Sequence, residues 1–440
     1  MNSAPIRHFD QARQAALHVL EDLVRQQRVE RALLSPDIFA RIRVALWFAD
    51  APSSDQRNEL EGRLSAATGP FWGGLWIAAA QTSNADRALL ESLWEEGAPH
   101  AASVSIRINE RHRSLSVWLR PLPGPPWPTD PEADAGGPPI LSFYAFKGGA
   151  GRSTALAIFA AQRAHAGERV VVVDLDLAAP GVGVLLGDPA VAQAGVVDYW
   201  LEQPLLGEHL DLRDYYFRVS QPAVIGSGEI LVFPAGNFDE GYLAKLARLD
   251  FAPPTEGKHP LETLLLHIRN ELHPDWILLD ARAGLSEATG FVFGGLAHLN
   301  LLFGGTSESN WRGLRLAVRR LGAERVRRNF PQAECLLIHS MAPANPQTAR
   351  LAEAEFLRRA EKTFEEEYYL PDPDDPAEDS FWYLRDMESR DAPHVPVSLF
   401  YSERIAFFTR LEDLVDYGLA AEDYRKLGER ITARFLRGST

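Results

Sequence analysis

Continuously apolar segments in the second half of the chain constrain its fold most strongly. They recur from residue 140 onward and alternate with segments of helical pattern. Strands without polar alternation are buried on both faces, which is typical of a parallel sheet covered by helices. We therefore predict a doubly wound, mainly parallel α/β domain whose ligand site lies at the carboxyl ends of the strands. The segments are ILSFYAF, RVVVVDLD, EILVFPAG, DWILLDA, LNLLFGG and ECLLIHS.

A proline-rich stretch, residues 121–139, separates this domain from the N-terminal part of the chain. Its prolines predict an extended, semi-rigid linker. Residues 1–120 show helical patterns near 8–28, 53–67 and 84–96 between short strands, and the pair SVSIRI and SLSVWLR is expected to close a small α/β (α+β) domain. This N-terminal domain carries no recognisable catalytic constellation, and we expect most of its tryptophans in the core.

Composition excludes several classes of protein. A length of 440 residues suits two domains of ordinary size, and a net charge of −15 argues against a protein that coats nucleic acid. The single cysteine, Cys335, excludes a disulfide framework and a cysteine-based metal site. No apolar run approaches the ~18 residues of a membrane span, and the N-terminus lacks a secretory pattern, so we expect a cytoplasmic protein. The acidic, proline-containing segment 364–379 predicts a solvated loop.

The first apolar segment leads into FKGGAGRST, residues 146–154, and a helical pattern follows directly. This order predicts a phosphate-binding loop, because glycines let backbone N–H groups approach phosphate oxygens and a helix N-terminus favours negative charge. The lysine expected near the end of such a loop is replaced by Arg152, and another lysine stands at its front. Ser153 is placed to coordinate Mg²⁺. The residues predicted to bind the nucleotide here are Lys147, Gly148, Gly149, Ala150, Gly151, Arg152, Ser153 and Thr154.

Acidic residues follow two further apolar segments. VVVVDLDLAAPGV contains Asp174 and Asp176, and WILLDARAG contains Asp280, with Gly284 four residues later. One acid of the first pair can hold the magnesium shell while the other orients a water molecule. An aspartate followed by such a glycine predicts a metal sensor and a backbone that can turn toward a γ-phosphate. We therefore predict that Ser153 and these three aspartates surround the metal, and that Asp280 and Gly284 contact the nucleotide.

At these residues the chain resembles the deviant Walker A P-loop ATPases of the ParA and MinD type, whose loop pattern is KGG-x-GK-[ST]. The resemblance covers roughly residues 140–345 and includes DLDLAAPG, GVVDYWLE, LVFPAGNFDEGYLAKLARLDF and DARAGLSE. Arg152 makes the loop similar to that of a subgroup with YKGGVGR[ST]. The resemblance implies that residues 140–440 form a P-loop NTPase domain with a C-terminal helix, which binds ATP and Mg²⁺.

The same resemblance implies a mechanism and a setting. Lys147 would reach the phosphates of a partner subunit, so that ATP binding drives formation of a homodimer. The catalytic residues would be Lys147, Asp176 and Arg152. Members of the subgroup are often encoded in bacterial conflict or regulatory loci, which implies a molecular switch that regulates a partner protein. The N-terminal domain is expected to bind that partner.

The loop arginine leaves alternatives open. Arg152 keeps the positive charge but is not equivalent to the compact charge of lysine, so nucleotide binding should persist while hydrolysis slows. A pseudo-ATPase scaffold that binds nucleotide without turnover is one alternative, and a DNA-partitioning ATPase is another. Arg282 is either a second cation near the γ-phosphate or the partner of a neighbouring acid. The family tends to recognise adenine with an asparagine after a late strand. Here His339 and Ser340 stand before Asn345, so the choice between adenine and guanine stays open.

Two surfaces suggest further contacts. Arg312, Arg315 and Arg319 share one face of a predicted helix. ParA-like relatives bind DNA through basic helical surfaces, so the resemblance implies that this face could bind DNA. Its ordinary interpretation is a solvated face, or one that contacts the acidic segment of the same chain. Near the C-terminus an apolar helical stripe either packs on the domain core or, as in MinD-like proteins, binds a membrane. The stripe consists of Ala420, Tyr424, Leu427, Ile431 and Phe435.

Overall fold

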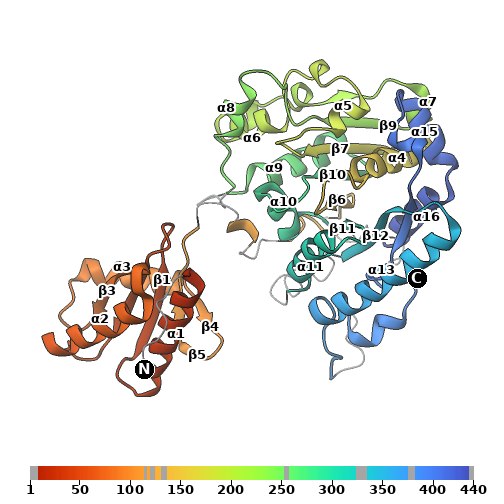
Figure 1. Cartoon of the computed structure of the whole chain (residues 1–440). Helices are drawn as coiled ribbons and strands as arrows, with labels where there is room; N and C mark the ends of the chain where they lie inside the picture. The colour runs from red at the N-terminus through yellow and green to blue at the C-terminus, as the bar shows by residue number, and fades with distance from the viewer. Residues whose placement is uncertain are drawn as a thin grey trace. The chain divides into compact units, whose positions relative to one another are not determined.

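The computed structural model describes residues 8–112, 116–118, 124–129, 136–251, 257–323, 334–374 and 382–435. The chain divides into two compact units, Met1–Ser114 and Leu115–Thr440 (Figure 1). Each unit is built around a sheet of its own. The division falls at residue 114, a short distance before the predicted boundary at 120.

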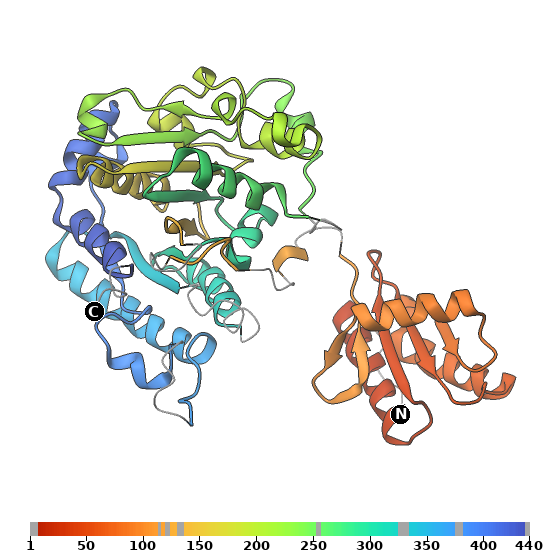
Figure 2. The same cartoon turned by 180° about the vertical axis from the view of Figure 1, so that it is seen from behind.

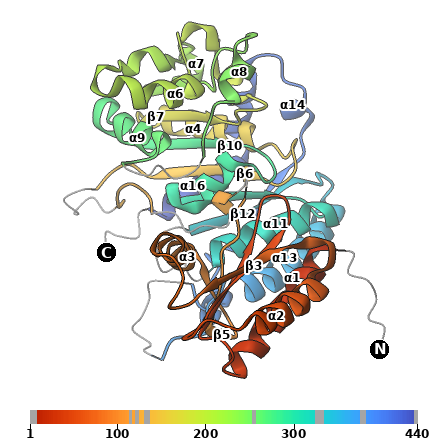
Figure 3. The ribbon, with the colours of Figure 1, turned by 90° about the vertical axis from the view of Figure 1, so that its left-hand side faces the viewer.

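The first unit is a five-stranded mixed sheet in the order β3-β2-β1-β5-β4. Figure 3 shows α3 on one side of the strands and α1 and α2 on the other. Leu20 and Leu64 pack with Val44 on the α1 and α2 side, whereas Trp94 packs with Trp47 on the α3 side. Its elements are α1 (Phe9–Arg25), β1 (Arg31–Pro36), β2 (Ile42–Trp47), α2 (Ser54–Thr68), η1 (Gly69–Phe71), β3 (Trp72–Ala78), α3 (Asn84–Glu96), β4 (Ala98–His100) and β5 (Ser103–Ile108).

The expected pairing of SVSIRI with SLSVWLR is wrong. β5 pairs antiparallel with β4, and it pairs parallel with β1, a strand that the pattern did not predict. Ser116–Trp118 forms a 3-10 turn, η2, and belongs to the second unit. Tertiary packing explains the difference, because Val117 is buried in the core of the second unit. The remainder of SLSVWLR lies outside the described residues.

The second unit has an eight-stranded sheet in the order β13-β12-β11-β6-β10-β7-β9-β8. All neighbours are parallel except β8 and β9. The predicted apolar segments form its buried centre, which confirms the expected mainly parallel α/β fold, whereas the short β8 and β13 were not predicted. The strands are β6 (Ile140–Ala145), β7 (Arg169–Leu175), β8 (Phe217–Arg218), β9 (Glu229–Phe233), β10 (Trp276–Ala281), β11 (Leu299–Gly304), β12 (Glu334–Ala342) and β13 (Val397–Phe400).

Helices cover both faces of this sheet. α4, α15 and α16 pack on one face, and α6, α9 and α10 pack on the other together with α11 and α13. The longer helices are α4 (Arg152–His165), α6 (Val196–Leu206), α9 (Pro260–His267), α11 (Glu308–Gly322), α13 (Pro346–Glu367), α15 (Leu411–Ala420) and α16 (Glu422–Ala433). The shorter ones are α5 (Val182–Leu186), η3 (Pro189–Val191), η4 (Gly207–His209), η5 (Leu212–Tyr215), α7 (Pro222–Ile225), α8 (Tyr242–Leu246), η6 (Ile268–Leu272), α10 (Glu287–Phe291), η7 (Val292–Leu296), η8 (Leu384–Glu388) and α14 (Glu403–Ala406).

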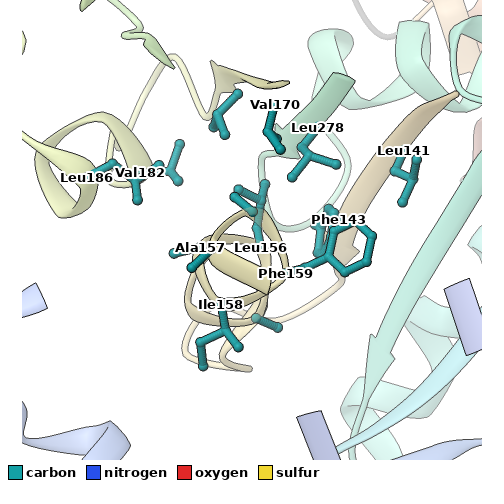
Figure 4. Close-up of a cluster of buried hydrophobic side chains, with 14 of the residues drawn as sticks. Leu141, Phe143, Leu156, Ala157, Ile158, Phe159, Val170, Val182, Leu186 and Leu278 are labelled. Carbon is teal, nitrogen blue, oxygen red and sulfur yellow. The ribbon is translucent and has the colours of Figure 1, made fainter. Parts of the chain in front are cut away.

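The helix α4 is held between the sheet and the C-terminal helices. Figure 4 shows its Leu156 and Phe159 beside Phe143 of β6. On its other side α15 and α16 approach closely (Figure 2). A Cβ atom at Gly418 would lie 2.6 Å from Ile158, so only glycine allows this contact. The N-terminus of α4 is thereby fixed relative to the strand ends.

Four of the five residues of the C-terminal stripe pack on the domain core, as its ordinary interpretation predicted, whereas Ala420 is exposed. Tyr424, Leu427 and Ile431 are buried in the same cluster as α4, and the ring of Phe435 lies 5.7 Å from that of Trp276. The apolar face that a membrane would bind is therefore already covered. In the described part of the chain, no helix is long and apolar enough to cross a bilayer.

Candidate phosphate-binding site

The glycine loop between β6 and α4 forms an open cradle of backbone groups. Gly149 and Gly151 have φ angles of +75° and +73°, a conformation that favours glycine. A Cβ atom at Gly148, Gly149 or Gly151 would meet nothing within 4 Å, so the space in front of the loop is free. The N–H groups from Gly148 to Thr154 have no acceptor among the described residues. Unpaired N–H groups at a helix N-terminus suit an anion, while the side chain of Ala150 packs into the core.

The predicted aspartates meet at the same edge of the sheet. β7 and β10 are parallel neighbours, and Asp174 lies opposite Asp280 in their register. Asp176 follows β7 directly. All three carboxyl groups are buried. Parallel strands thus bring together acids that are more than a hundred residues apart in the sequence.

The first two residues of α4 connect the loop to these acids. Ser153 Oγ donates a hydrogen bond to Asp280 Oδ2 at 2.7 Å. Arg152 Nε donates to Asp280 Oδ1 at 3.2 Å, and Arg152 Nη2 donates to Asp176 Oδ2. The loop arginine therefore bridges the ends of β7 and β10.

Asp174 is bound by backbone groups. Its Oδ1 accepts from the N–H of Asp176 at 3.1 Å, and its Oδ2 accepts from the N–H groups of Gly181 and Gly183 at 3.2 Å each. These bonds hold the loop that follows β7. Burial raises the pKa of Asp174 to about 8 and the neighbouring Asp280 adds to the rise, whereas the N–H groups oppose it.

Asp280 is fully buried beside a guanidinium. Burial raises the pKa of this carboxyl to about 6, while the charge of Arg152 and the hydroxyl of Ser153 act in the opposite direction. Arg282, on the segment after β10, places its Nε 3.9 Å from Asp176 Oδ1. Arg282 therefore lies beside an acid, which was one of its two predicted roles. Two arginines, Arg152 and Arg282, therefore face the acids of this site.

Two other predicted residues flank the loop. Lys147 is exposed, with its Nζ 5.7 Å from the centre of the Phe146 ring. Gly284 has a φ of +76°, and its N–H donates to the carbonyl of Ala145 at 3.1 Å. The segment that carries Gly284 is thus tied to the end of β6 by a single backbone hydrogen bond that could be exchanged for one to a ligand.

Of the four predicted metal ligands, Ser153, Asp176 and Asp280 have oxygen donors that fit the preference of Mg²⁺ for hard ligands, whereas both carboxyl oxygens of Asp174 accept backbone N–H groups. Asp176 Oδ1 is buried without a hydrogen-bond partner, which leaves an acceptor for such a cation or its water. Across the described residues, no group of three or more His, Cys, Asp or Glu side chains is arranged to hold a metal. Phosphate oxygens would therefore have to complete the shell, as Mg²⁺ commonly requires. Bound there, Mg²⁺ would neutralise phosphate charge.

The basic stripe on α11 is paired with acids of the same chain. Arg312 Nε lies 2.9 Å from Glu308, and Arg315 and Arg319 both contact Glu367 at 2.7 Å. Glu367 is the last residue of α13, so the start of the segment predicted as a solvated loop is helical and pairs with the stripe. The rest of that segment includes residues 375–379, which lie outside the described residues.

Two of the candidates for base recognition, His339 and Ser340, are buried, and the third, Asn345, is exposed and caps a helix. His339 is buried and stacks on the ring of Phe356 at 4.4 Å. Ser340 donates to the carbonyl of Gly304, and Asn345 accepts from the first N–H groups of α13 as its N-cap. A side chain that caps a helix is not free to select a base.

Sequence reasoning missed how the chain around Trp118 and Trp127 attaches to the second unit. Trp118 Nε1 donates to the carbonyl of Ser286 at 2.6 Å, and its ring stacks on Phe293 at 5.6 Å. A Cβ atom at Gly290 would lie 2.6 Å from the indole, so this glycine makes room for it. Trp127 is also buried. Trp118 and Trp127 therefore fasten the described parts of residues 116–129 to the rest of the second unit, and Trp118 does so beside the segment that carries Gly284.

No protein-family model matches the chain, and no curated protein matches its sequence. Among solved structures, ParA of pNOB8 is 13% identical, and the match covers 68% of this chain and 99% of ParA at a TM-score of 0.45. Cell division ATPase MinD of Pyrococcus furiosus is 19% identical, and the match covers 67% of this chain and 98% of MinD at a TM-score of 0.41. In fold, the chain is similar to ParA and MinD.

Cobyrinic acid a,c-diamide synthase of Mycobacterium smegmatis, solved with an ATP analogue and magnesium, is 16% identical. It covers 68% of this chain with 96% of its own length, at a TM-score of 0.43. Similarities this distant do not identify a ligand, a reaction or a partner. The chemistry of this chain has to be inferred from its own site.

Proposed function

We propose that the chain is an ATP-binding switch that hydrolyses ATP slowly and dimerises when the nucleotide is bound. One observation carries this proposal. The open glycine loop, the N-terminus of α4 and the buried acids of β7 and β10 converge at one edge of a parallel sheet. Unpaired N–H groups beside carboxyl groups suit a phosphate chain that arrives with a cation.

In this proposal each residue has a defined task. Ser153, Asp176 and Asp280 would hold Mg²⁺ when it displaces Arg152 from the two acids, while the N–H groups from Gly148 to Thr154 bind phosphate oxygens. Asp174 keeps the loop after β7 in place through its three backbone hydrogen bonds. Asp176 also orients the attacking water once its oxygens are released from Arg152.

The switch itself lies in Gly284. Its N–H is bonded to Ala145 in the structure, and a γ-phosphate would compete for the same donor. Ser286 and α10 follow within a few residues, and Trp118 is docked on them. A shift of Gly284 toward the phosphate would therefore reach the linker that leads to the N-terminal unit. We propose that the N-terminal unit binds a protein partner, in a bacterial conflict or signalling system.

Lys147 is proposed to act across a homodimer. Its side chain is exposed and, among the described residues, no acid lies within ion-pairing distance. An unpaired lysine at the front of a phosphate loop is available to the phosphates of a second copy. Dimer formation would then require ATP.

Solution mass tests this proposal. Light scattering would compare the wild type and Lys147→Ala without nucleotide, with Mg-ADP and with Mg-ATP. We expect dimers only for the wild type with Mg-ATP. Lys258→Ala is the matched control, because Lys258 is exposed and pairs with Glu262 of its own unit. A mass indifferent to nucleotide, or a Lys147→Ala dimer, would reject the dimerisation switch.

A scaffold without turnover is a second candidate, and the contact between Arg152 and Asp176 favours it. An aspartate held by a buried guanidinium is a poor group for orienting water. Single-turnover assays separate the two candidates, because a scaffold binds ATP without releasing phosphate above background. The ion pairs of Arg312, Arg315 and Arg319 speak against DNA as the partner. Charge reversal of all three should leave DNA binding unchanged.

A further inference from the structure

Arg152 has an unusual position for a residue expected to bind phosphate. Its guanidinium contacts Asp176 and Asp280 at once, and the three side chains are only 12%, 7% and 1% exposed. Buried carboxylates need a positive counterpart, because isolated charges are costly to remove from water. Here the chain supplies that counterpart from the loop itself.

These carboxylates are also the ones that would hold a divalent cation. Ser153 Oγ, the remaining donor of the candidate metal shell, is bonded to Asp280 Oδ2 at 2.7 Å. The fork of an arginine can bridge two carboxylates, whereas the ammonium of a lysine is a compact point charge. The replacement of the loop lysine by arginine thus changes which group neutralises the acids.

Two buried atoms of this cluster still need partners. Arg152 Nη1 and Asp176 Oδ1 have no hydrogen-bond partner. Buried polar atoms are almost always paired, so a donor and an acceptor remain for a ligand. A phosphate oxygen would satisfy the first, and a water or a hydroxyl of the ligand would satisfy the second.

We propose that Arg152 is a resident cation that takes the place of the divalent metal in this site. Arg152 and Mg²⁺ then compete for Asp176 and Asp280, and the protein binds nucleotide with little dependence on the metal. The part that concerns nucleotide rests on the proposed function. The part that concerns the metal does not, because it can be measured with Mg²⁺ alone.

The first experiment uses Mg²⁺ without nucleotide. Thermal unfolding would be followed in EDTA and in MgCl₂ for the wild type, Arg152→Met and Arg152→Lys. We expect the wild-type midpoint to be unchanged by Mg²⁺. Arg152→Met should unfold at a lower temperature in EDTA, because the buried Asp176 and Asp280 lose the guanidinium that bridges them, and Mg²⁺ should restore much of the loss. Arg312→Met, which removes an exposed arginine paired with Glu308, is the control and should not respond to Mg²⁺.

Two results would overturn the metal part. One is a wild type that Mg²⁺ stabilises as strongly as it stabilises the variants. The other is a set of variants that gain nothing from Mg²⁺. Arg152→Lys keeps a positive charge in the loop, so it provides the comparison if Arg152→Met does not fold.

The second experiment measures ATP affinity by calorimetry with EDTA and with Mg²⁺. We expect the wild-type affinities to agree within a few-fold, and Arg152→Lys to lose about tenfold or more in EDTA because a lysine cannot bridge the two acids. Equal metal dependence in both proteins would refute the inference. Absence of ATP binding in every condition would instead reject the proposed function, and the result with Mg²⁺ alone would still decide the role of Arg152.

Discussion

The contact between Gly313 of α11 and the ring of Phe146 offers a direct way to disturb the front of the phosphate loop. A Cβ atom at Gly313 would lie 2.0 Å from the ring, where ordinary contact is 3.4–4 Å. Overpacking of this kind costs about 1–3 kcal/mol, and the short approach places Gly313→Ala near the upper end. Alanine recovers about 1 kcal/mol of helix propensity. We expect a net loss of about 2 kcal/mol in the free energy of unfolding.

The loss should be accompanied by weaker nucleotide binding. Phe146 immediately precedes Lys147, so a displaced ring moves the start of the loop. Urea unfolding followed by circular dichroism would measure stability, and calorimetry would measure ATP affinity. Gly62→Ala in α2 is the control, because a Cβ atom there meets nothing within 4 Å, and this variant should be as stable as the wild type or more stable. The reasoning fails if Gly313→Ala is as stable as the wild type.

Three further predictions concern other parts of the chain. Burial lowers the pKa of His298 from 6.5 to about 4, while its Nε2 donates to the carbonyl of Trp127. About 3 kcal/mol of stability should therefore be present above pH 6.5 and be lost as pH falls toward 4. In urea unfolding, the free energy of His298→Gln should change less between these pH values than that of the wild type. Ile431→Ala should lower the free energy of unfolding by about 2–5 kcal/mol in urea, because Ile431 is fully buried. Because the stripe that contains Ile431 packs on the core, wild-type protein should not sediment with lipid vesicles. Ser53→Ala removes the capping box with Gln56 and should lower the stability of the first unit by about 1 kcal/mol, whereas an unchanged unfolding midpoint would contradict the role of the cap.

The centre of the second unit could be predicted from local pattern. Segments such as RVVVVDLD have no polar face, so burial between two helix layers is the arrangement that suits them. The loop could also be located, because its glycines stand between a strand and a helix. Asp174 and Asp280 could be placed together because parallel strands end at one edge.

Contacts between distant residues could not be predicted in this way. SLSVWLR alternates like a strand, yet Trp118 enters a space that exists only because residue 290 is glycine. Arg152 was expected to face phosphate, and its contact with Asp176 depends on the spacing of two strands. The hydroxyl of Ser340 donates to the carbonyl of Gly304, a partner that the local sequence does not reveal. Each of these outcomes was decided by tertiary packing.

The close packing of α15 and α16 on α4 has a consequence for the order in which the protein is made. The loop and its acids are complete once residue 284 has been synthesised, but the helix behind the loop still lacks α15 and α16. Their Gly418 and Gly428 pack so closely on it that a Cβ atom would lie 2.6 Å from Ile158 and 2.4 Å from Gln162. A nascent chain on the ribosome would expose Ile158 and its apolar neighbours until residues 411–433 emerge. Nucleotide binding should therefore mature late in translation, after the last helices have docked.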